Sequence, residues 1–232
     1  MREYVDVLLP YITRKVNASL SQGRLPVSQK HAIVTPLLKK TELDSSDMNN
    51  FRPVSNLSFI SKVVERVVTS QLHQYLAAND LLPRFQSAYR KYHSTETAMQ
   101  RVWFDILVAA DDRQVKLLGL LDLSTAFDCV NHSMLLERLQ SAFGLTDLVH
   151  DWVAQSFLTD RMQQIAYSGQ LSSVQSVLFG VPQGSVLGPL LYVLYTAELA
   201  LVVDCHGLSL HQYADDTQVY ISTPAGDAEA AI

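Results

Sequence analysis

The segment from His211 to Tyr220 constrains the fold most, because two adjacent carboxylates interrupt a run of alternating, β-prone residues. This alternation predicts two short strands joined by a tight turn, with Asp215 and Asp216 at the tip of the hairpin. Aspartate is common in turns, so a purely structural turn is the ordinary interpretation of an Asp-Asp pair by itself. A functional interpretation therefore depends on what the rest of the chain adds to this pair.

A continuous apolar run from Val115 to Leu123, broken by a single lysine, predicts a buried central strand that ends in Asp122. Carboxylates at strand ends lie at the rim of a sheet, where open α/β sheets bind their ligands. The strand and the hairpin can therefore direct three carboxylates at one point, Asp122 with Asp215 and Asp216. Such a cluster cannot stay fully ionised without cations. Mg²⁺ suits it best, and two ions about 4 Å apart would serve phosphoryl transfer.

The net charge of −5 hides an asymmetry between the two halves of the chain. Residues 1–118 hold 16 Lys and Arg against 11 Asp and Glu, whereas residues 119–232 hold 2 against 12. A basic half suits a polyanionic partner, and an acidic half that keeps its carboxylates together needs cations. Uneven surface charge without a function is the alternative at this point.

The remaining periodic segments predict an α+β chain. Helices are expected over residues 4–20, 58–79, 94–110, 133–143, 146–158 and 188–203, and further strands over 31–38, 163–167 and 173–179. The 186–203 stretch is apolar but marginal in length for a membrane span and contains Glu198, so a buried core helix is predicted and no membrane partner. Cys129 and Cys205 fit neither a disulfide framework nor a metal site, so no disulfide partner is expected.

Several residues in the chain suit a nucleotide. Gly180 and Gly184 allow the backbone to approach it closely, and Gln183 between them offers an amide. Phe127, five residues after Asp122, would place a ring beneath the sugar, so that a 2′-hydroxyl clashes and deoxyribonucleotides are favoured. In the basic half, three cations are placed to reach a triphosphate: Lys39, Lys40 and Arg52. Each feature also has a structural interpretation: glycines in a turn, a core phenylalanine, and an arginine stiffened by the proline that follows.

Residues 81–92 predict a loop in which cations and aromatic rings alternate, including Arg84, Phe85, Tyr89 and Arg90. Base stacking and phosphate contact use this mixture. A solvated loop anchored by aromatic side chains uses it too, so the loop alone does not decide between the two.

The chain closely resembles the reverse transcriptase domain of LINE-type (non-LTR) retrotransposons. The resemblance covers nearly everything from Leu25 to Ser222 and is carried by five segments in the family's order. They are Asn50 to Ser55 (NFRPVS), Phe85 to Arg90 (FQSAYR), Leu121 to Asp128 (LDLSTAFD), Gly180 to Pro189 (GVPQGSVLGP) and Tyr213 to Asp216 (YADD). The stretch Ala126 to Asp128 and the long helical segment after it favour the LINE type over group II intron or retron enzymes.

The resemblance implies a right-hand polymerase, with fingers and a ferredoxin-like palm sheet covered by helices. It implies that Asp122 and Asp215 are metal ligands with Asp216 as the third catalytic carboxylate, binding Mg²⁺ or in its place Mn²⁺. Phe127 falls on the family's sugar gate, and Gln183 and Gly184 on the palm loop that supports the incoming nucleotide. Lys39, Lys40 and Arg52 are assigned to its phosphates. Tyr213 and Arg90 are assigned to the primer and template.

The resemblance also implies a division of the chain. An N-terminal helical extension is expected at residues 1–24, fingers at 25–118, palm at 119–222 and a flexible tail at 223–232. The family's next palm motif, its primer-grip strands and its thumb are expected to be absent, as is a preceding endonuclease domain. We therefore expect a fragment of a larger element or a degraded copy, weakly active or inactive by itself.

The function predicted from the sequence is RNA-directed DNA polymerisation, in which a deoxynucleotide is added to a primer 3′-hydroxyl by two-metal nucleotidyl transfer. The expected partners are an RNA template, a DNA primer and deoxynucleoside triphosphates, in the cytoplasm and nucleus. The alternative is a catalytically impaired remnant that only binds nucleic acid, because the basic half would survive the loss of catalysis. A structural domain built on the same fold is a third interpretation, which does not explain why the acids and the 180–184 loop occur together.

Overall fold

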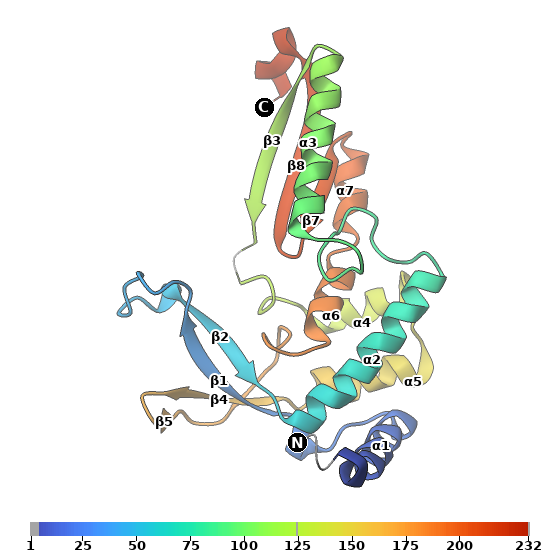
Figure 1. Ribbon diagram of the computed structural model, residues 1–232, viewed down its shortest axis with the longest axis vertical. Coiled ribbons are helices and arrows are strands. Elements are labelled where there is room, and N and C mark those ends of the chain that lie inside the picture. The colour runs from blue at the N-terminus through green and yellow to red at the C-terminus, as the bar shows by residue number, and fades with distance from the viewer. Residues whose placement is uncertain (1–4, 124, 232) are drawn as a thin grey trace. The chain divides into compact units, whose positions relative to one another are not determined.

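The computed structural model describes residues 5–123 and 125–231 of the chain. The described residues form two compact units, each assembled from two separate parts of the sequence. Unit 1 contains Met1–Leu81 and Phe127–Leu191, and unit 2 contains Leu82–Ala126 and Tyr192–Ile232. Each unit has its own sheet and its own helices (Figure 1).

The sheet of unit 1 is mixed. Strand β1 pairs antiparallel with β2 and parallel with β4, and β4 pairs with the two-residue strands β5 and β6. The bounds are His31–Leu38 (β1), Phe51–Asn56 (β2), Met162–Tyr167 (β4), Gln170–Leu171 (β5) and Gln175–Ser176 (β6). The predicted strand at 173–179 is therefore wrong in extent, because only its residues 175 and 176 pair with β4.

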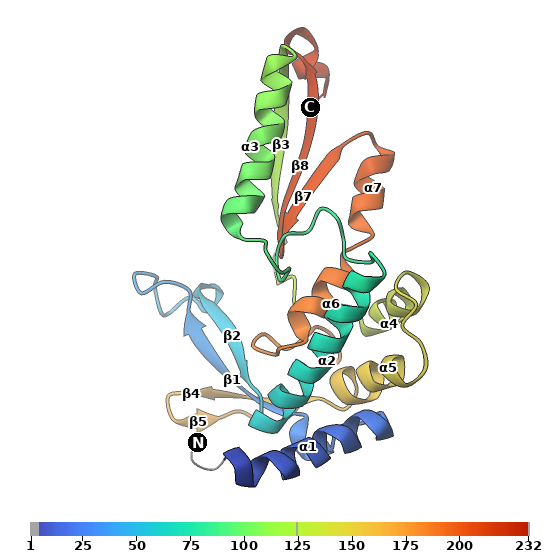
Figure 2. The same ribbon diagram turned by 45° about the vertical axis from the view of Figure 1, so that its right-hand side comes forward.

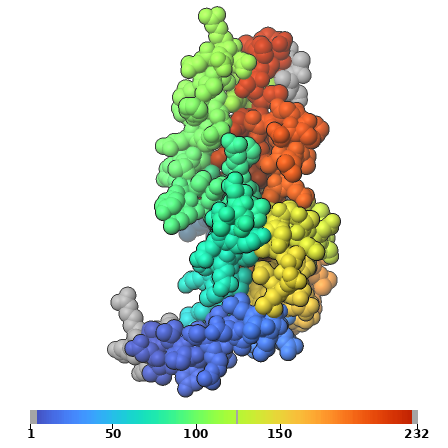
Figure 3. All heavy atoms as spheres, turned by 90° about the vertical axis from the view of Figure 1, so that its right-hand side faces the viewer, coloured from blue at the N-terminus to red at the C-terminus, as the bar shows by residue number. Residues whose placement is uncertain are grey.

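The helices of unit 1 are α1 (Val5–Gln22), α2 (Phe59–Ala78), α4 (His132–Ser141) and α5 (Asp147–Trp152). A π-helical turn, Val153–Leu158, continues α5. Helix α2 begins where predicted, because the Ser58 side chain accepts the Ser61 N–H at 3.1 Å. Helix α4 begins at His132, one residue before its predicted start at 133, because the Asn131 side chain caps it by accepting the Met134 N–H at 3.0 Å. Helices α1, α2 and α5 lie side by side in the space-filling view (Figure 3).

Unit 2 contains a three-stranded antiparallel sheet of β3 (Gln114–Asp122), β8 (Asp216–Pro224) and β7 (Ser209–Tyr213), in that order. Helix α3 (Thr95–Asp111) lies along this sheet, and α7 (Leu199–Cys205) lies beside β7 (Figure 2). Ser94 and Thr97 form a reciprocal capping box that starts α3. The Tyr220 hydroxyl donates to Asp105 Oδ2 at 2.6 Å and so joins β8 to α3.

The prediction that residues 115–123 form a strand is confirmed, but the prediction that this strand is buried and central is wrong. Strand β8 pairs with both neighbours, which leaves β3 at the edge. The side chains of Leu120 and Leu121 are 72% and 52% exposed. An apolar run identifies a strand but does not say which neighbours pair with it, and this is the reason for the error.

The apolar segment after residue 187 forms two helices where one was predicted. Helix α6 spans Gly188–Tyr195, and α7 follows a turn that contains Glu198. Within the described residues, Gly188–Cys205 is the one segment long and apolar enough to cross a membrane, and 39% of it is buried inside the molecule. Leu187, Leu190, Leu191 and Leu194 are all fully buried, which accounts for the apolar character of α6 without a membrane.

The predicted fingers and palm boundaries stay predictions. Helix α3, expected within the fingers at 25–118, belongs to unit 2 together with β3 and the β7–β8 hairpin. At the C-terminal end, β8 continues to Pro224 and a 3₁₀ helix follows at Ala225–Ala231, so the structure places regular elements where a flexible tail was expected.

Candidate active site

The predicted acidic hairpin is present, and a two-residue turn forms its tip. Tyr213 pairs with Asp216, so Ala214 and Asp215 make the turn between β7 and β8. Ala214 has a φ of +58°, a left-handed conformation that an alanine adopts only at a cost. Positive φ at the first turn position matches the right-handed twist of hairpin strands. The turn therefore presents Asp215 at the very tip and Asp216 at the first position of β8.

A buried glutamine that the sequence reasoning did not single out holds this turn. Gln86 is 3% exposed, and its side chain accepts the Ala214 N–H at 2.9 Å and donates to the Ala214 carbonyl at 3.2 Å. The backbone on either side of it pairs with β7, through Gln212 N to Phe85 O and Ser87 N to Gln212 O. Gln86 lies within one of the family segments, which was the available signal. Its partner, a backbone turn, could not be read from the sequence.

The register between β3 and β8 brings two of the three predicted carboxylates together. Asp122 lies directly opposite Asp216, and opposite residues of an antiparallel pair project from the same face with Cβ atoms about 5 Å apart. Both side chains are exposed, and that of Asp215 is half-buried. Within the described part of the chain, none of the three carboxylates forms an ion pair or accepts a hydrogen bond.

The donor set suits a hard divalent cation, although it is not a closed metal cage. Among residues 5–123 and 125–231, no three His, Cys, Asp or Glu side chains gather closely enough to hold a metal ion. Carboxylate oxygens without a protein cation nearby are nevertheless the ligands that Mg²⁺ takes, with substrate phosphates and water completing its shell. The paired Asp122 and Asp216, with Asp215 next in sequence at the hairpin tip, therefore offer the ligand type for an ion that arrives with a phosphorylated substrate.

Two tyrosines face the charge of Asp215. Burial, and after it the negative charge of Asp215, raises the pKa of Tyr192 to about 12. The same two causes raise the pKa of Tyr89, whose backbone has a φ of +55°. Both phenols therefore stay protonated at neutral pH and add no negative charge beside the carboxylate.

A cavity of about 310 Å³ adjoins the paired carboxylates in unit 2. Asp122 and Asp216 line it together with Tyr213, and α3 contributes Ala98 and Met99. Tyr213 is therefore next to the acids, as the prediction of its role requires. Arg90 lies in the loop before α3, where its guanidinium donates to the Pro83 carbonyl at 3.3 Å. Its predicted contact with primer or template stays a prediction.

The glycine loop belongs to unit 1, and backbone hydrogen bonds hold both of its sides. Gly180 N donates to Val130 O and Val181 N donates to Phe127 O, each at 2.8 Å. On the other side, Ser55 N donates to Gln183 O at 2.7 Å. Gly184 has a φ of +99°, and a Cβ there would lie 2.9 Å from the Ser55 carbonyl oxygen. The loop therefore needs glycine for both conformation and space.

Gln183, predicted to support a nucleotide, has a half-buried side chain whose Nε2 donates to Asp128 Oδ2 at 3.2 Å. Partial desolvation raises the pKa of Asp128, and this hydrogen bond opposes the rise. Phe127, the predicted sugar gate, is half-buried at the start of the same segment of unit 1. Phe127, Gln183 and Gly184 thus belong to one group of segments that backbone hydrogen bonds hold together.

The three predicted phosphate-binding cations lie at one end of the β1–β2 hairpin. Leu37 pairs with Arg52, and Lys39 N donates to Asn50 O at 2.8 Å, so Lys39 and Lys40 follow β1 where β2 begins. All three side chains are exposed, and in the described residues none forms an ion pair. They remain available for an anionic ligand, and their role stays a prediction.

Residues 37–232 match the protein family described as reverse transcriptase (RNA-dependent DNA polymerase). The chain belongs to this family. The resemblance inferred from the five segments is therefore confirmed.

Relatives of this reverse transcriptase domain include proteins of mobile elements. It is 31% identical over 219 residues to the "RNA-directed DNA polymerase from mobile element jockey" of Drosophila melanogaster. It is 32% identical over 218 residues to the "Probable RNA-directed DNA polymerase from transposon BS" of the same organism. Each match covers 92% of this chain, which spans about a quarter (24%) of each relative's length.

Solved structures agree on the fold. The apo telomerase of Candida tropicalis, truncated from its C-terminal domain, matches with a TM-score of 0.59 at 14% identity, over 88% of this chain and 45% of that one. Telomerase from Candida albicans, in complex with a fragment of telomeric RNA, also gives 0.59, at 12% identity, over 93% of this chain and 41% of that one. At these identities the likeness supports a reverse transcriptase fold and nothing more specific.

Proposed function

We propose that this reverse transcriptase domain catalyses RNA-directed DNA polymerisation as part of a non-LTR retrotransposon protein. The observation that carries the proposal is the pairing of Asp122 with Asp216, beside Asp215 at the hairpin tip, with no cation of the described protein neutralising them. Three uncompensated carboxylates in a family of nucleotidyl transferases are best explained by binding divalent metal ions.

The residues of unit 2 would hold the metal ions, for which Asp122, Asp215 and Asp216 are the ligands. Bound there, Mg²⁺ would supply activation of the primer 3′-hydroxyl and stabilisation of the leaving pyrophosphate oxygen. Tyr213 beside the acids would position the primer end, and Arg90 would contact the nucleic acid. Positioning and electrostatics supply most of the catalysis in phosphoryl transfer, so the geometry of this hairpin is the main contribution of unit 2.

The residues of unit 1 would bind the deoxynucleoside triphosphate. The exposed Lys39, Lys40 and Arg52 are available for its phosphates, and the ring of Phe127 would exclude a 2′-hydroxyl. Gln183 and Gly184 would support the base and sugar from the glycine loop. An RNA template and a DNA primer complete the proposed set of partners.

A replacement of Asp215 by Asn tests the proposal, because it removes one metal-binding charge and keeps the side chain's size. In a chain of the length of its relatives, Asp215→Asn should lower Mg²⁺-dependent primer extension on RNA by at least about 100-fold, as expected for losing a main electrostatic group of an active site. Binding of primed template in a gel-shift assay should change little. Asp204→Asn removes the same charge from the exposed end of α7 and should leave extension intact.

Unchanged extension by Asp215→Asn would contradict the assignment. If the unmodified chain binds primed template but extends no primer with Mg²⁺ or Mn²⁺, the alternative holds and the protein only binds nucleic acid. The same assay on residues 1–232 alone tests the expectation that this segment is weakly active by itself, which efficient, processive extension would refute.

A further inference from the structure

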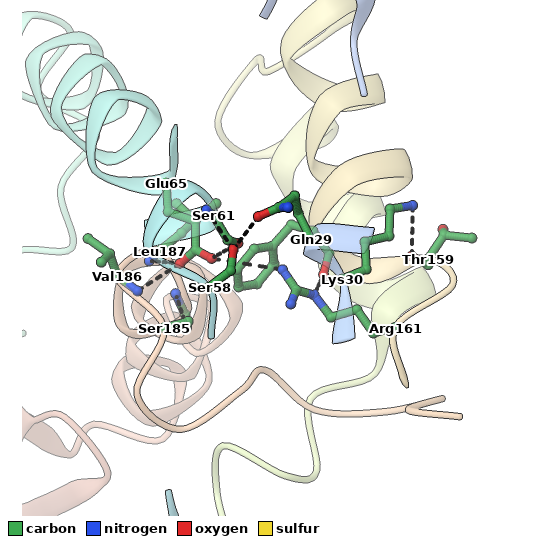
Figure 4. Close-up of polar contacts among 12 residues, drawn as sticks. Gln29, Lys30, Ser58, Ser61, Glu65, Thr159, Arg161, Ser185, Val186 and Leu187 are labelled. Atoms are coloured by element: carbon green, nitrogen blue, oxygen red, sulfur yellow. Dashed lines mark hydrogen bonds and ion pairs between the residues drawn. The ribbon is translucent and has the colours of Figure 1, made fainter. Parts of the chain in front are cut away.

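Glu65 on α2 is a carboxylate buried where no mechanism described above requires one. It is 1% exposed. Burying a carboxylate is costly unless hydrogen bonds and a counter-charge compensate for lost hydration. Figure 4 shows how this is done: the carboxylate points away from α2 towards the backbone of Val186 and Leu187, with Ser61 and Arg161 on its other side.

The two oxygens of this carboxylate have different partners. Glu65 Oε2 accepts the backbone N–H groups of Val186 at 2.8 Å and Leu187 at 3.3 Å. Glu65 Oε1 accepts the Ser61 hydroxyl at 3.0 Å and lies 3.9 Å from Arg161 Nη2. One oxygen therefore binds a distant backbone segment, while the other is held by the Glu65 helix and by the counter-ion.

Arg161 compensates the charge of Glu65 from a distance of 3.9 Å. It is 3% exposed, its Nε donates to the Phe157 carbonyl, and its guanidinium lies 4.6 Å from the centre of the Phe157 ring. These contacts fix the guanidinium beside the π-helical turn that contains Phe157. The arginine thus lowers the free-energy cost of burying Glu65, and Glu65 itself accepts the hydrogen bonds from the 186–187 backbone.

The backbone that Glu65 binds lies directly before α6 and leads into its first turn. The first N–H groups of a helix have no partner within the helix, and negative charge is favourable there. Ser185 Oγ accepts the Gly188 N–H at 3.0 Å, and Glu65 accepts the two N–H groups before it. The helix start is thus held from within its own segment by Ser185 and from α2 by Glu65.

This helix start is also the C-terminal anchor of the glycine loop. Ser185 N donates to Pro182 O at 3.0 Å, which closes a tight turn around Gln183 and Gly184. The N-terminal side of the loop is bound through Gly180 and Val181. Gln183 lies three residues before Val186, so a displacement of the 186–187 backbone moves the turn that carries it.

We propose that Glu65 is a positioning residue for nucleotide binding: it fixes the start of α6 and thereby sets where the Gln183 amide is presented. The expected effect on nucleotide binding rests on the proposed function, whereas the contact between Glu65 and the 186–187 backbone does not. Aspartate would be one methylene too short to reach the same backbone. Glutamine keeps one accepting oxygen but removes the negative charge, so the hydrogen bonds to the 186–187 backbone lose their charge assistance and the buried Arg161 loses its counter-charge.

The first experiment measures hydrogen exchange in residues 1–232. Glu65→Gln should speed exchange of the Val186 and Leu187 amides by about tenfold or more relative to the rest of unit 1, as expected when a charge-assisted hydrogen bond is lost. Leu76→Val is the matched control, because Leu76 is fully buried on the same helix about 16 Å from Glu65. Leu76→Val should lower the stability of unit 1 without speeding exchange of the Val186 and Leu187 amides more than that of the other amides in the unit.

The second experiment measures primer extension in a chain of the length of its relatives. Glu65→Gln should raise the KM for deoxynucleoside triphosphates about tenfold with a smaller change in kcat, whereas Leu76→Val should lower the active fraction and leave KM unchanged. If Glu65→Gln leaves exchange of the Val186 and Leu187 amides unchanged, the contact does not protect these amides and the proposal is overturned. If exchange becomes faster but the KM stays the same, the positioning role is overturned. An unmodified chain that extends no primer refutes the proposed function, while the exchange result still decides the contact.

A milder variant decides the question if Glu65→Gln does not fold. Ser61→Ala keeps the charge of Glu65 and removes one hydrogen bond to Oε1. If Ser61→Ala speeds exchange of the Val186 and Leu187 amides and raises the KM, each by less than Glu65→Gln was expected to, the proposal is supported. If the exchange rates and the KM of Ser61→Ala both match those of the unmodified protein, the proposal is overturned.

Discussion

Replacing Gly180 by alanine should destabilise unit 1 by about 2–5 kcal/mol. Gly180 has a φ of +81°, which costs an L-residue about 1–2 kcal/mol. A Cβ at this position would lie 2.8 Å from both Cα and O of Asp128 and 2.9 Å from Phe127 O. These are backbone atoms, which cannot rotate away as a flexible side chain can, so overpacking should add about 1–3 kcal/mol.

Gly169 offers a control that separates the two contributions. It lies between β4 and β5 with a φ of +75°, and a Cβ there would meet nothing within 4 Å. Gly169→Ala should therefore cost only the conformational part, about 1–2 kcal/mol. Urea unfolding of both variants measures the difference between their free energies of unfolding, which can be taken from the two midpoint urea concentrations when the m-values agree. Equal losses of stability would refute the argument that the loop is packed against the 127–128 backbone.

Two further predictions concern single side chains. Burial, and after it the charge of Arg101, lowers the pKa of His211 from its usual value near 6.5, so the folded state favours the neutral ring. The neutral His211 ring should contribute its full share to the free energy of unfolding of unit 2 above about pH 6.5, and this contribution should fall as the pH is lowered from there towards the folded-state pKa. Urea unfolding between about pH 5 and 8 measures this dependence, and His211→Gln should flatten it. Phe127→Ala should raise ribonucleotide incorporation relative to deoxyribonucleotide incorporation in primer extension, and an unchanged ratio would remove its role as sugar gate.

Local signals in the sequence were sufficient for most elements. Helices α2 and α3 begin where predicted, and the structure shows Ser58 and Ser94 as their caps, because a helix start is decided by residues within one helical turn. The β7–β8 hairpin follows from alternation on either side of Asp215 and Asp216. The metal-binding candidates were predictable for the same reason, since Asp122 ends a strand and the other two acids occupy a turn.

Features that depend on pairing over long distances were not predictable in the same way. The position of β3 at the sheet edge depends on which strand lies next to it, and its apolar run does not contain that information. The break between α6 and α7 occurs at Thr196 to Glu198, where the residues themselves are compatible with helix. In both cases local propensity left several outcomes open, and tertiary contacts selected one.

Gln86 and Glu65 show why the supporting residues of the site escaped prediction. Each is a buried polar side chain that binds backbone groups more than 100 residues away, at Ala214 and at Val186 with Leu187. A backbone partner places no demand on the residue type there, so no motif records the contact. The contact still matters energetically: the left-handed Ala214 costs about 1–2 kcal/mol, and two hydrogen bonds at about 1 kcal/mol each offset it. A turn that presents the proposed catalytic acids in an unfavourable conformation therefore depends on a residue that its own sequence does not identify.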